Sequence, residues 1–272
     1  MTDAECVALL QWALPRLRLR WPGFRKVRRQ VRRRLGRRLT ALELASPADY
    51  RAYLAAHPDE WTWLDAACRI SISRFYRDRR VWERLIGQVL PALAADARAR
   101  AAPAVRAWSA GCASGEEPYT LALAWERALG APLPLEVLAT DADPAMVERA
   151  RAGRYPPSSL RDLPPAWRDA FACADGVWIL APEVRARVGF AAADVREPPP
   201  PGPWDLVLCR NLVFTYFAEP LQREALGQLI AGLRPGGALV IGHGERLPAP
   251  APELAPWGDL RGVFRRSAPE RG

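Results

Sequence analysis

The chain has 272 residues, of which 50% are hydrophobic, enough for one large domain or two small ones whose core needs no disulfide or metal. No apolar run reaches the roughly 18 residues that a membrane-spanning helix needs, and the first residues carry acids without a basic start, so we expect neither membrane insertion nor a signal peptide. The five cysteines are scattered without a CxxC pair and the two histidines lie far apart, which argues against a metal site and favours the reducing cytoplasm.

The formal net charge of +9 comes from one segment of the chain. Residues 16–38 contain twelve basic residues and no acid, so the remainder carries a net charge of −3 (9 minus 12). Any argument for an acidic partner or for a nucleic acid therefore concerns this segment.

Residues 1–78 are predicted to form an all-helical N-terminal domain. Their apolar positions recur at helical spacing, and we expect helices over residues 3–17, 24–39, 46–57 and 59–70. Pro22 and Gly23 are expected to break the chain between the first two helices, and Ser46 is expected to cap the third. The second helix carries arginine on most faces, opposite an apolar stripe formed by Phe24, Val27, Val31 and Leu35.

Residues 79–272 alternate strands and helices, which predicts an α/β domain with a parallel sheet covered on both faces. We expect strands over residues 104–110, 135–140, 204–210, 238–243 and, at an edge, 260–267, and helices over residues 116–129, 143–153 and 220–233. The last helix is expected to end in the RPGG turn. Residues 153–190 interrupt the alternation with polar, proline-bearing sequence, so we expect an inserted subdomain there.

The first strand of this domain leads into the sequence GCASGEE, a glycine turn followed by two acids. Ligands of open parallel sheets bind at the carboxyl ends of strands, where Gly111 and Gly115 let the backbone come close. A phosphate site would offer basic side chains, but Glu116 and Glu117 stand here, and residues 107–126 contain no Lys or Arg. The two acids suit either the positive end of the helix dipole or a cationic ligand.

Two further acids follow apolar runs that are expected to end at the same edge of the sheet. Asp141 stands where an acid commonly accepts hydrogen bonds from both hydroxyls of a ribose. Asp194 is placed to accept a hydrogen bond from the amino group of an adenine, while Val195 donates its backbone N–H. An adenosine with a cationic, amino-acid-bearing tail fits these positions, and S-adenosylmethionine is such a molecule.

Several segments of the chain are similar to those of one protein family. They are SISRFYRD (71–78), WSAGCASGEEPYTLAL (108–123), ATDAD (139–143), GRY (153–155), WDLVLCRN (204–211) and LRPGGALVIGHGE (233–245). Over nearly its whole length the chain resembles the CheR-type methyltransferases, the chemotaxis receptor glutamate methyltransferase family. The resemblance implies a Rossmann-like class I methyltransferase domain with a small inserted subdomain, preceded by an all-helical N-terminal domain.

The resemblance also implies a set of site residues. By motif position, the residues expected at the S-adenosylmethionine cofactor are Ser71, Ser73, Arg77, Gly111, Glu117, Asp141, Asp194, Val195, Asn211 and Leu212. Arg77 stands where the family has its essential arginine, and its guanidinium is expected to pair with a carboxylate of the cofactor or of the substrate. We assign the catalytic roles to Arg77, Tyr216 and Asn211, and we expect no metal.

This chain departs from the family pattern at three places. It reads CRNLVFTYF (209–217) where the family reads C-R-N-V-L-I-Y-F, so either Tyr216 reaches the family position through a bulge or Thr215 occupies it. Ser71 and Ser73 replace an Asn and a Thr. The insert lacks the glycine-rich loop of members that dock a receptor's C-terminal pentapeptide, so tethered docking is not expected.

The expected reaction is methyl transfer to a carboxylate, most simply that of a protein glutamate. A carboxylate with a pKa of about 4.3 is ionised at neutral pH and needs no general base, which agrees with a sequence that offers no evident His or Cys base. Two alternatives remain open. One is a methyltransferase acting on a small molecule or on another protein side chain, and the other is a module that binds the cofactor without turnover.

The basic segment 24–39 allows three interpretations. It recognises an acidic protein helix, as the resemblance implies, or it binds nucleic acid electrostatically, or it is a solvated arginine face. Only Trp21 and Phe24 supply aromatic rings nearby, and Phe24 belongs to the apolar stripe, so stacking on bases is poorly supported. We therefore expect a cytoplasmic enzyme with an acidic protein partner and without a nucleic-acid partner.

Overall fold

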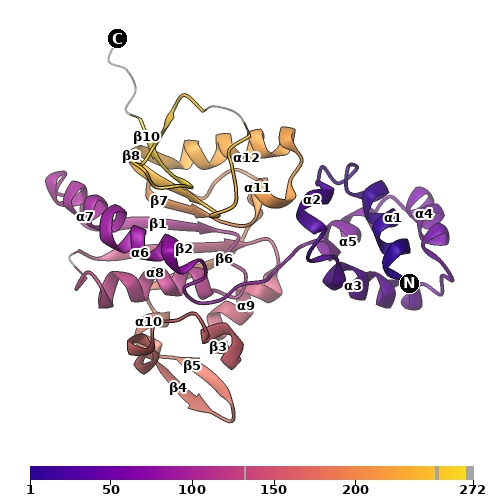
Figure 1. The fold of residues 1–272 in the computed structure, drawn as a ribbon, viewed down its shortest axis with the longest axis horizontal. Coiled ribbons are helices and arrows are strands. Elements are labelled where there is room, and N and C mark those ends of the chain that lie inside the picture. Colours follow the sequence, from indigo (N-terminus) through magenta and orange to yellow (C-terminus); the bar gives the residue numbers. More distant parts are fainter. Residues whose placement is uncertain (132, 249–250, 268–272) are drawn as a thin grey trace. The chain divides into compact units, whose positions relative to one another are not determined.

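The computed structural model describes residues 1–131, 133–248 and 251–267. The chain forms two compact units (Figure 1). The helical unit consists of Met1–Ile70 together with Thr215–Gln222, and the α/β unit consists of Ser71–Phe214 and the chain from Arg223 onward. The division at Ile70 precedes the boundary expected at residue 78, and the helical unit contains a short segment from late in the chain.

The helical unit contains the four expected helices and one more. Its helices are α1 (Asp3–Ala13), α2 (Trp21–Phe24), α3 (Arg28–Ala41), α4 (Pro47–Ala56) and α5 (Glu60–Ala67). Ser46 caps α4 as predicted, since its side chain accepts a hydrogen bond from the backbone N–H of Asp49. Thr2 and Glu5 form a reciprocal capping box at the start of α1.

The expected helix over residues 24–39 is divided in the structure. Pro22 and Gly23 lie inside the short helix α2 and do not break the chain, because proline at the first helical turn has no hydrogen bond to lose. Phe24 ends α2, and α3 begins only at Arg28. No side chain caps α3, so the sequence carries no signal for this start.

The core of the helical unit is built on the apolar stripe of α3. Val31 and Leu35 are fully buried and Leu39 nearly so. A polar cluster lies beside this stripe, where the Glu60 carboxylate is only 4% exposed and accepts hydrogen bonds from Arg38 and, at 2.7 Å, from the Tyr50 hydroxyl. These contacts satisfy a buried acid and join α3, α4 and α5.

The α/β unit is built on a seven-stranded sheet, as the alternation of strands and helices predicts. Its strands are β1 (Val105–Ala110), β2 (Leu135–Asp141), β6 (Val188–Ala192), β7 (Trp204–Cys209), β8 (Leu233–Ile241), β9 (Leu254–Pro256) and β10 (Val263–Arg266). Their order is β6-β2-β1-β7-β8-β10-β9. The first five run parallel to their neighbours, whereas β10 pairs antiparallel with β8 and β9. The sheet thus brings the carboxyl ends of β6, β2, β1 and β7 to one edge.

Helices connect these strands. They are α6 (Arg79–Arg84), the π-helical turn η1 (Leu85–Val89), α7 (Leu90–Ala99), α8 (Glu116–Arg127), α9 (Pro144–Ala152), α11 (Val213–Tyr216) and α12 (Glu219–Gly232). The run from α6 to α7 was not among the predicted elements. It buries Trp82, Leu85 and Leu90 in the core of this unit.

One prediction for the last parallel strand is wrong. The segment Arg234–Gly237 was expected to end the preceding helix, but it lies within β8, which begins at Leu233. The pairing of β7 with β8 shifts register between Trp204 and Leu206. This irregularity accommodates the two glycines inside the strand.

The inserted subdomain is a small antiparallel sheet. It contains β3 (Arg154–Tyr155), β4 (Phe171–Ala174) and β5 (Val177–Leu180) in the order β3-β5-β4, with the short turns η2 (Pro157–Leu160), η3 (Pro165–Ala170) and α10 (Pro182–Arg185). Figure 1 shows β4 and β5 standing apart from the main sheet. The insertion lies between α9 and β6, inside the expected range 153–190, although β6 already begins at Val188.

Candidate functional site

The loop after β1 is held against the neighbouring strand end. The backbone N–H groups of Gly111 and Cys112 both donate to the carbonyl oxygen of Thr140, at 2.8 and 2.9 Å. Gly111 has a φ of +79°, and a Cβ there would lie 2.3 Å from Cδ2 of Leu212. Only glycine allows this close approach, so Gly111 and Leu212 form one wall of the edge where β1 and β7 end.

A second glycine starts the helix that carries the two acids. Gly115 has a φ of +90°, and a Cβ there would lie 2.9 Å from Cβ of Ala150 in α9. The turn therefore packs tightly against α9, and Glu116 and Glu117 fall in the first turn of α8. Their side chains have different environments.

Glu116 has a structural role. It is 3% exposed, and its carboxylate accepts hydrogen bonds from the Ser114 hydroxyl at 3.0 and 3.1 Å and from the Ser159 hydroxyl at 3.3 Å. These contacts join the loop after β1 to the inserted subdomain. Because Glu116 is almost completely buried and joins two parts of the chain through these contacts, we assign it to the structure and not to a ligand.

Glu117 lies at the strand ends, between β1 and β7. Its carboxylate accepts hydrogen bonds from the Ser109 hydroxyl at 2.9 Å and from Nη1 of Arg210 at 3.1 Å. Burial raises the pKa of this carboxyl group, while the Arg210 guanidinium and the Ser109 hydroxyl oppose the rise. This carboxylate is desolvated and held in place, as suits recognition of an ammonium group.

Asp141 is fixed by the loop that it faces. Its Oδ2 accepts a hydrogen bond from the backbone N–H of Ala113 at 2.8 Å, and its Oδ1 accepts one from the backbone N–H of Asp143 at 2.9 Å. These contacts fix the carboxylate in one orientation at the end of β2, and the expected contact with a pair of ribose hydroxyls stays a prediction. The carbonyl oxygen of Asp141 also accepts the N–H of Ala193, at 3.1 Å, which joins the ends of β2 and β6.

Asp194 has a partner that the sequence did not predict. Its carboxylate accepts hydrogen bonds from Nε of Arg196 at 2.9 Å and from Nη2 at 2.6 Å. It also accepts the backbone N–H of Arg196 at 3.0 Å. The neighbouring Val195 is buried. The expected contact of Asp194 with an adenine stays a prediction, and it now involves a carboxylate already paired with a guanidinium.

The segment before α6 carries Arg77 in a constrained conformation. Arg77 lies between Tyr76 and Asp78, whose φ angles of +58° and +62° are uncommon for residues other than glycine. The backbone N–H of Tyr76 donates to the Thr120 hydroxyl at 3.0 Å, and Nη1 of Arg77 donates to the carbonyl oxygen of Ile72 at 2.8 Å. The half-buried Ser71 and Ser73 precede these residues in the same segment.

Asn211 is held at the end of β7 by an acid that the sequence analysis did not assign. Its φ is +57°, and its backbone N–H donates to Oε2 of Glu245 at 2.9 Å. The same oxygen accepts the N–H of Gly242. Glu245 is 7% exposed and therefore ties the ends of β7 and β8 together.

Arg210 is the second residue that sequence reasoning missed. It lies in the CRN motif, directly after β7, and it binds both Glu117 and Asp78. A basic residue that follows a fully buried strand at this edge was a signal for an internal partner, because an arginine there cannot reach water easily.

Tyr216 belongs to the other compact unit. Residues 213–216 form the helical turn α11, and the ring of Tyr216 packs edge-on against Phe24, with 5.2 Å between the ring centroids. Thr215 lies in the same turn, and its carbonyl oxygen accepts a hydrogen bond from Nε of Arg20 at 3.0 Å. The roles expected for Tyr216 or Thr215 stay predictions.

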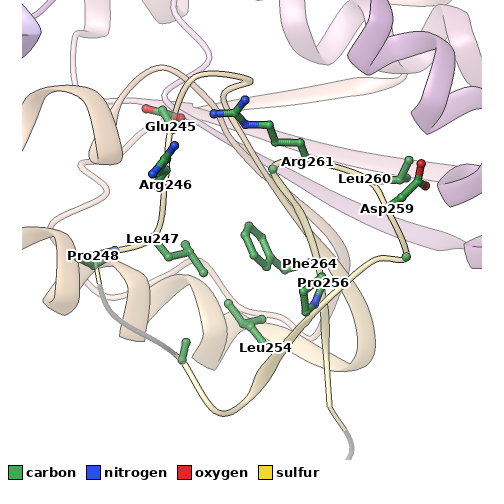
Figure 2. Close-up of a pocket in the computed structure, with 13 residues that line it drawn as sticks. Glu245, Arg246, Leu247, Pro248, Leu254, Pro256, Asp259, Leu260, Arg261 and Phe264 are labelled. Carbon is green, nitrogen blue, oxygen red and sulfur yellow. The ribbon is translucent and has the colours of Figure 1, made fainter.

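A pocket of about 670 Å³ lies between the chain after β8 and the strands β9 and β10 (Figure 2). Leu247, Leu254 and Phe264 give it an apolar wall, and Arg246 and Arg261 also line it. It borders on Glu245, the acid that binds the N–H of Asn211, so it adjoins the strand ends.

Within residues 1–131, 133–248 and 251–267, no group of three or more His, Cys, Asp or Glu side chains is arranged to hold a metal ion. Likewise, in the same ranges no helix has both the length and the apolar character needed to cross a membrane.

Two family models match the chain. The CheR methyltransferase SAM-binding domain matches residues 71–255, and the CheR methyltransferase all-alpha domain matches residues 26–64. Among curated proteins, a chemotaxis protein methyltransferase of Listeria monocytogenes is 37% identical over 183 residues, which cover 67% of this chain and 68% of that protein. The chemotaxis protein methyltransferase of Klebsiella aerogenes is 33% identical over 228 residues, covering 80% of this chain and 75% of its relative.

A solved structure of the N-methyltransferase NodS from Bradyrhizobium japonicum, in complex with S-adenosyl-L-homocysteine, matches 61% of this chain and 63% of its own with 17% identity. Its TM-score of 0.34 is too low to carry an argument. The family models and the relatives are sufficient to assign the family. They match both the helical part of the chain and the sheet whose strand ends hold Glu117 and Asp141. This chain belongs to the CheR methyltransferase family and is an S-adenosylmethionine-dependent methyltransferase.

Proposed function

We propose that the enzyme methylates a carboxylate, the side chain of a glutamate in a chemoreceptor. The observation that carries this proposal is the pair of fixed carboxylates at adjacent strand ends, Glu117 and Asp141, together with Arg77, whose charge acts on Glu117. The acids suit a cationic cofactor, and the arginine suits an anionic acceptor. The relatives that are named chemotaxis protein methyltransferases support the choice of acceptor.

S-adenosylmethionine supplies an electrophilic methyl group, to which an acceptor oxygen bonds as the carbon–sulfur bond breaks. A glutamate carboxylate has a pKa of about 4.3, so it is already ionised and the protein need not remove a proton. The protein then has two tasks, to align the acceptor with the methyl group and to exclude water. Transfer would convert the carboxylate into a neutral methyl ester and the sulfonium into a neutral thioether, so charge would balance.

Each residue of the site has an assigned role under this proposal. Glu117 would accept a hydrogen bond from the ammonium group of the cofactor, and Asp141 would accept hydrogen bonds from its ribose hydroxyls. Arg77 and Tyr216 orient the acceptor. The remaining residues assigned to the cofactor are Ser71, Ser73, Gly111, Asp194, Val195, Asn211 and Leu212.

The acidic partner is proposed to bind the exposed arginines of the helical unit. Some arginines of α3 already have structural partners, as Arg28 does in its 2.8 Å ion pair with Asp3. A different set of α3 residues is exposed at a spacing of four, namely Arg29, Arg33 and Arg37. Residues four apart share one helix face, so this set forms a continuous positive stripe for an acidic helix. We assign no pentapeptide tether to this enzyme.

We place the enzyme in the cytoplasm, where the signalling domains of its proposed receptors would meet it. The five cysteines are all unpaired thiols, four of them buried, which agrees with a reducing compartment.

The test uses the full chain, methyl-labelled S-adenosylmethionine and a purified chemoreceptor signalling domain from the same organism. A carboxyl ester releases volatile labelled methanol in mild base, and Arg77→Gln is expected to abolish this release. A base-stable labelled product would overturn carboxylate methylation in favour of another acceptor. Tight cofactor binding without methyl transfer to any acceptor would show that the protein is not an active methyltransferase.

A further inference from the structure

Arg210 connects three segments at the edge of the sheet. Its side chain is only 2% exposed. Nη1 donates to Oε2 of Glu117 at 3.1 Å. Nη2 donates to Oδ2 of Asp78 at 2.9 Å and to the carbonyl oxygen of Arg77 at 3.0 Å. The guanidinium also lies over the ring of Trp82, 5.6 Å from its centroid, so one buried cation joins the first turn of α8 to the chain around Arg77.

We propose that Arg210 is a positioning residue for methyl transfer, which keeps the Glu117 carboxylate ionised and holds the backbone of Arg77 in place. The inference rests on the proposed function, since it takes Glu117 as a ligand of the cofactor and Arg77 as the cation that orients the acceptor. Arg210 acts through these two residues and is not assigned a contact with either substrate.

The first half of the proposal follows from the burial of Glu117. Burial favours the protonated form of this carboxyl group and raises its pKa, and the charges of Arg210 and Arg77 together with the Ser109 hydroxyl oppose that rise. Of these three, Arg210 makes a direct ion pair. Without it, Glu117 would bind a proton at a higher pH, and a neutral acid attracts an ammonium group far less than a carboxylate does.

Two thiols also lie near the carboxylate. Burial raises the pKa of Cys112 and of Cys209 well above the ordinary value, so both thiols are neutral around neutral pH. They therefore place no negative charge beside Glu117 that would disfavour its ionised form. The ionisation of Glu117 therefore depends first on Arg210, with smaller contributions from the Ser109 hydroxyl and from Arg77.

The second half follows from the backbone around Arg77. Tyr76 and Asp78 on either side of it adopt left-handed conformations, which cost free energy and persist only where the surroundings impose them. The forked guanidinium of Arg210 binds the carbonyl group of Arg77 and the side chain of Asp78 at once. A fork is suited to fixing two acceptors in one geometry, which an ammonium group cannot do as well.

A purely stabilising role would fit the surroundings of Arg210 poorly. Its Nε–H is buried and has no hydrogen-bond partner among the described residues. A buried donor without a partner costs stability, and buried ion pairs are often replaced by apolar groups without loss. A cation placed between the carboxylates of Glu117 and Asp78 is better explained by its effect on the site.

The test measures the affinity of the full chain for S-adenosylhomocysteine by calorimetry at several pH values. The ratio of the Kd of Arg210→Gln to the Kd of the wild type is expected to rise about tenfold as the pH falls from about 8 to about 6, because Glu117 binds a proton earlier in the variant. Titration of the probe itself cancels in this ratio. A constant ratio across this range would overturn the proposal.

Two further variants separate the possible failures. Glu117→Gln is expected to weaken binding at every pH, and an unchanged affinity would contradict the placement of the cofactor and therefore the proposed function. Arg210→Lys keeps the charge, so it is expected to retain the wild-type pH profile while turnover falls about tenfold through loss of the fork. If Arg210→Gln does not fold, unchanged turnover in Arg210→Lys at an unchanged Tm would by itself overturn the positioning role.

Discussion

The backbone N–H of Arg20 donates a 2.8 Å hydrogen bond to the carbonyl oxygen of Tyr216. Around this contact, Leu19 and Phe217 form an antiparallel bridge, and Phe24 packs on the ring of Tyr216. The tyrosine assigned to the acceptor is therefore held by residues from the start of the chain. Changes in those residues are expected to affect turnover.

Gly23 is the first position where this dependence can be measured. A Cβ there would lie 2.4 Å from the carbonyl oxygen of Thr215 and 3.0 Å from Cδ1 of Tyr216. Gly23→Ala is therefore expected to displace α11, to cost about 1–3 kcal/mol of stability and to lower kcat, while the affinity for S-adenosylhomocysteine is unchanged. Gly36→Ala in α3 is the control, since a Cβ there meets nothing within 4 Å. Unchanged kcat in Gly23→Ala would remove Tyr216 from the mechanism.

The two neighbouring acids of α8 are expected to respond in opposite ways. Glu117→Gln should weaken the affinity for S-adenosylhomocysteine about 10- to 100-fold, as loss of a charge-assisted hydrogen bond worth about 1.5–3 kcal/mol implies. Glu116→Gln should lower the Tm and leave that affinity near its original value, because Glu116 binds Ser114 and Ser159. Calorimetry and thermal unfolding of both variants check this. If Glu116→Gln weakened binding and Glu117→Gln lowered only the Tm, Glu116 would be the cofactor ligand and Glu117 the structural residue.

Asp141→Asn tests the ribose site. Both oxygens of Asp141 accept a backbone N–H, and the amide of asparagine can accept only one of the two. We expect the affinity for S-adenosylhomocysteine to fall about tenfold or more. Asp143→Asn is the matched control, because Asp143 caps α9 through the N–H of Ala145 and asparagine caps a helix equally well. Equal effects of the two changes would argue against a ligand at Asp141.

The buried acid of the helical unit predicts a pH dependence of stability. Burial alone would raise the pKa of Glu60, but the hydrogen bonds from Arg38 and Tyr50 outweigh it and hold the pKa below the ordinary value of 4.5. A lowered pKa contributes stability above pH 4.5, and this contribution is lost as the pH falls below that value. In urea unfolding, Glu60→Gln should cost about 1–3 kcal/mol at neutral pH and remove this part of the acid sensitivity. An identical pH slope in the variant would contradict the assignment.

The positive stripe of α3 is tested by charge reversal. Replacing Arg29, Arg33 and Arg37 by Glu should raise the KM for an acidic receptor domain about tenfold or more and leave the affinity for S-adenosylhomocysteine unchanged. The control carries the same change of charge at exposed arginines elsewhere, Arg80, Arg149 and Arg168. An equal loss in the control would mean that net charge, and not the stripe, attracts the partner. The effect should diminish with added salt.

The sequence predicted the α/β part well because its signals are local. Apolar runs followed by acids mark strand ends, and parallel strands bring those ends together, so Glu117 and Asp141 fell at one edge. In the structure Glu116 and Glu117 have different partners, whereas the sequence pattern of two adjacent acids does not distinguish them. Their difference depends on Ser159, a residue of the inserted subdomain that is distant in the sequence.

What the sequence did not reveal depends on long-range contacts or on unmarked helix ends. The ion pairs of Arg210 and the pairing of Asp194 with Arg196 require knowledge of side-chain directions. The break between α2 and α3 carries no capping residue, so the periodic apolar stripe concealed it. The grouping of Tyr216 with Phe24 joins opposite parts of the chain, which no local pattern encodes.

The short segment Thr215–Gln222 gives the enzyme an interwoven architecture. The polypeptide leaves the α/β unit after Phe214 and returns to it at Arg223, so the helical unit at the start of the chain includes a piece of sequence encoded much later. A chimera that exchanges residues 1–70 between relatives without residues 215–222 would pair surfaces that did not evolve together. Substrate preference in this family is therefore expected to depend on two separated stretches of the chain, which must be exchanged together in a chimera.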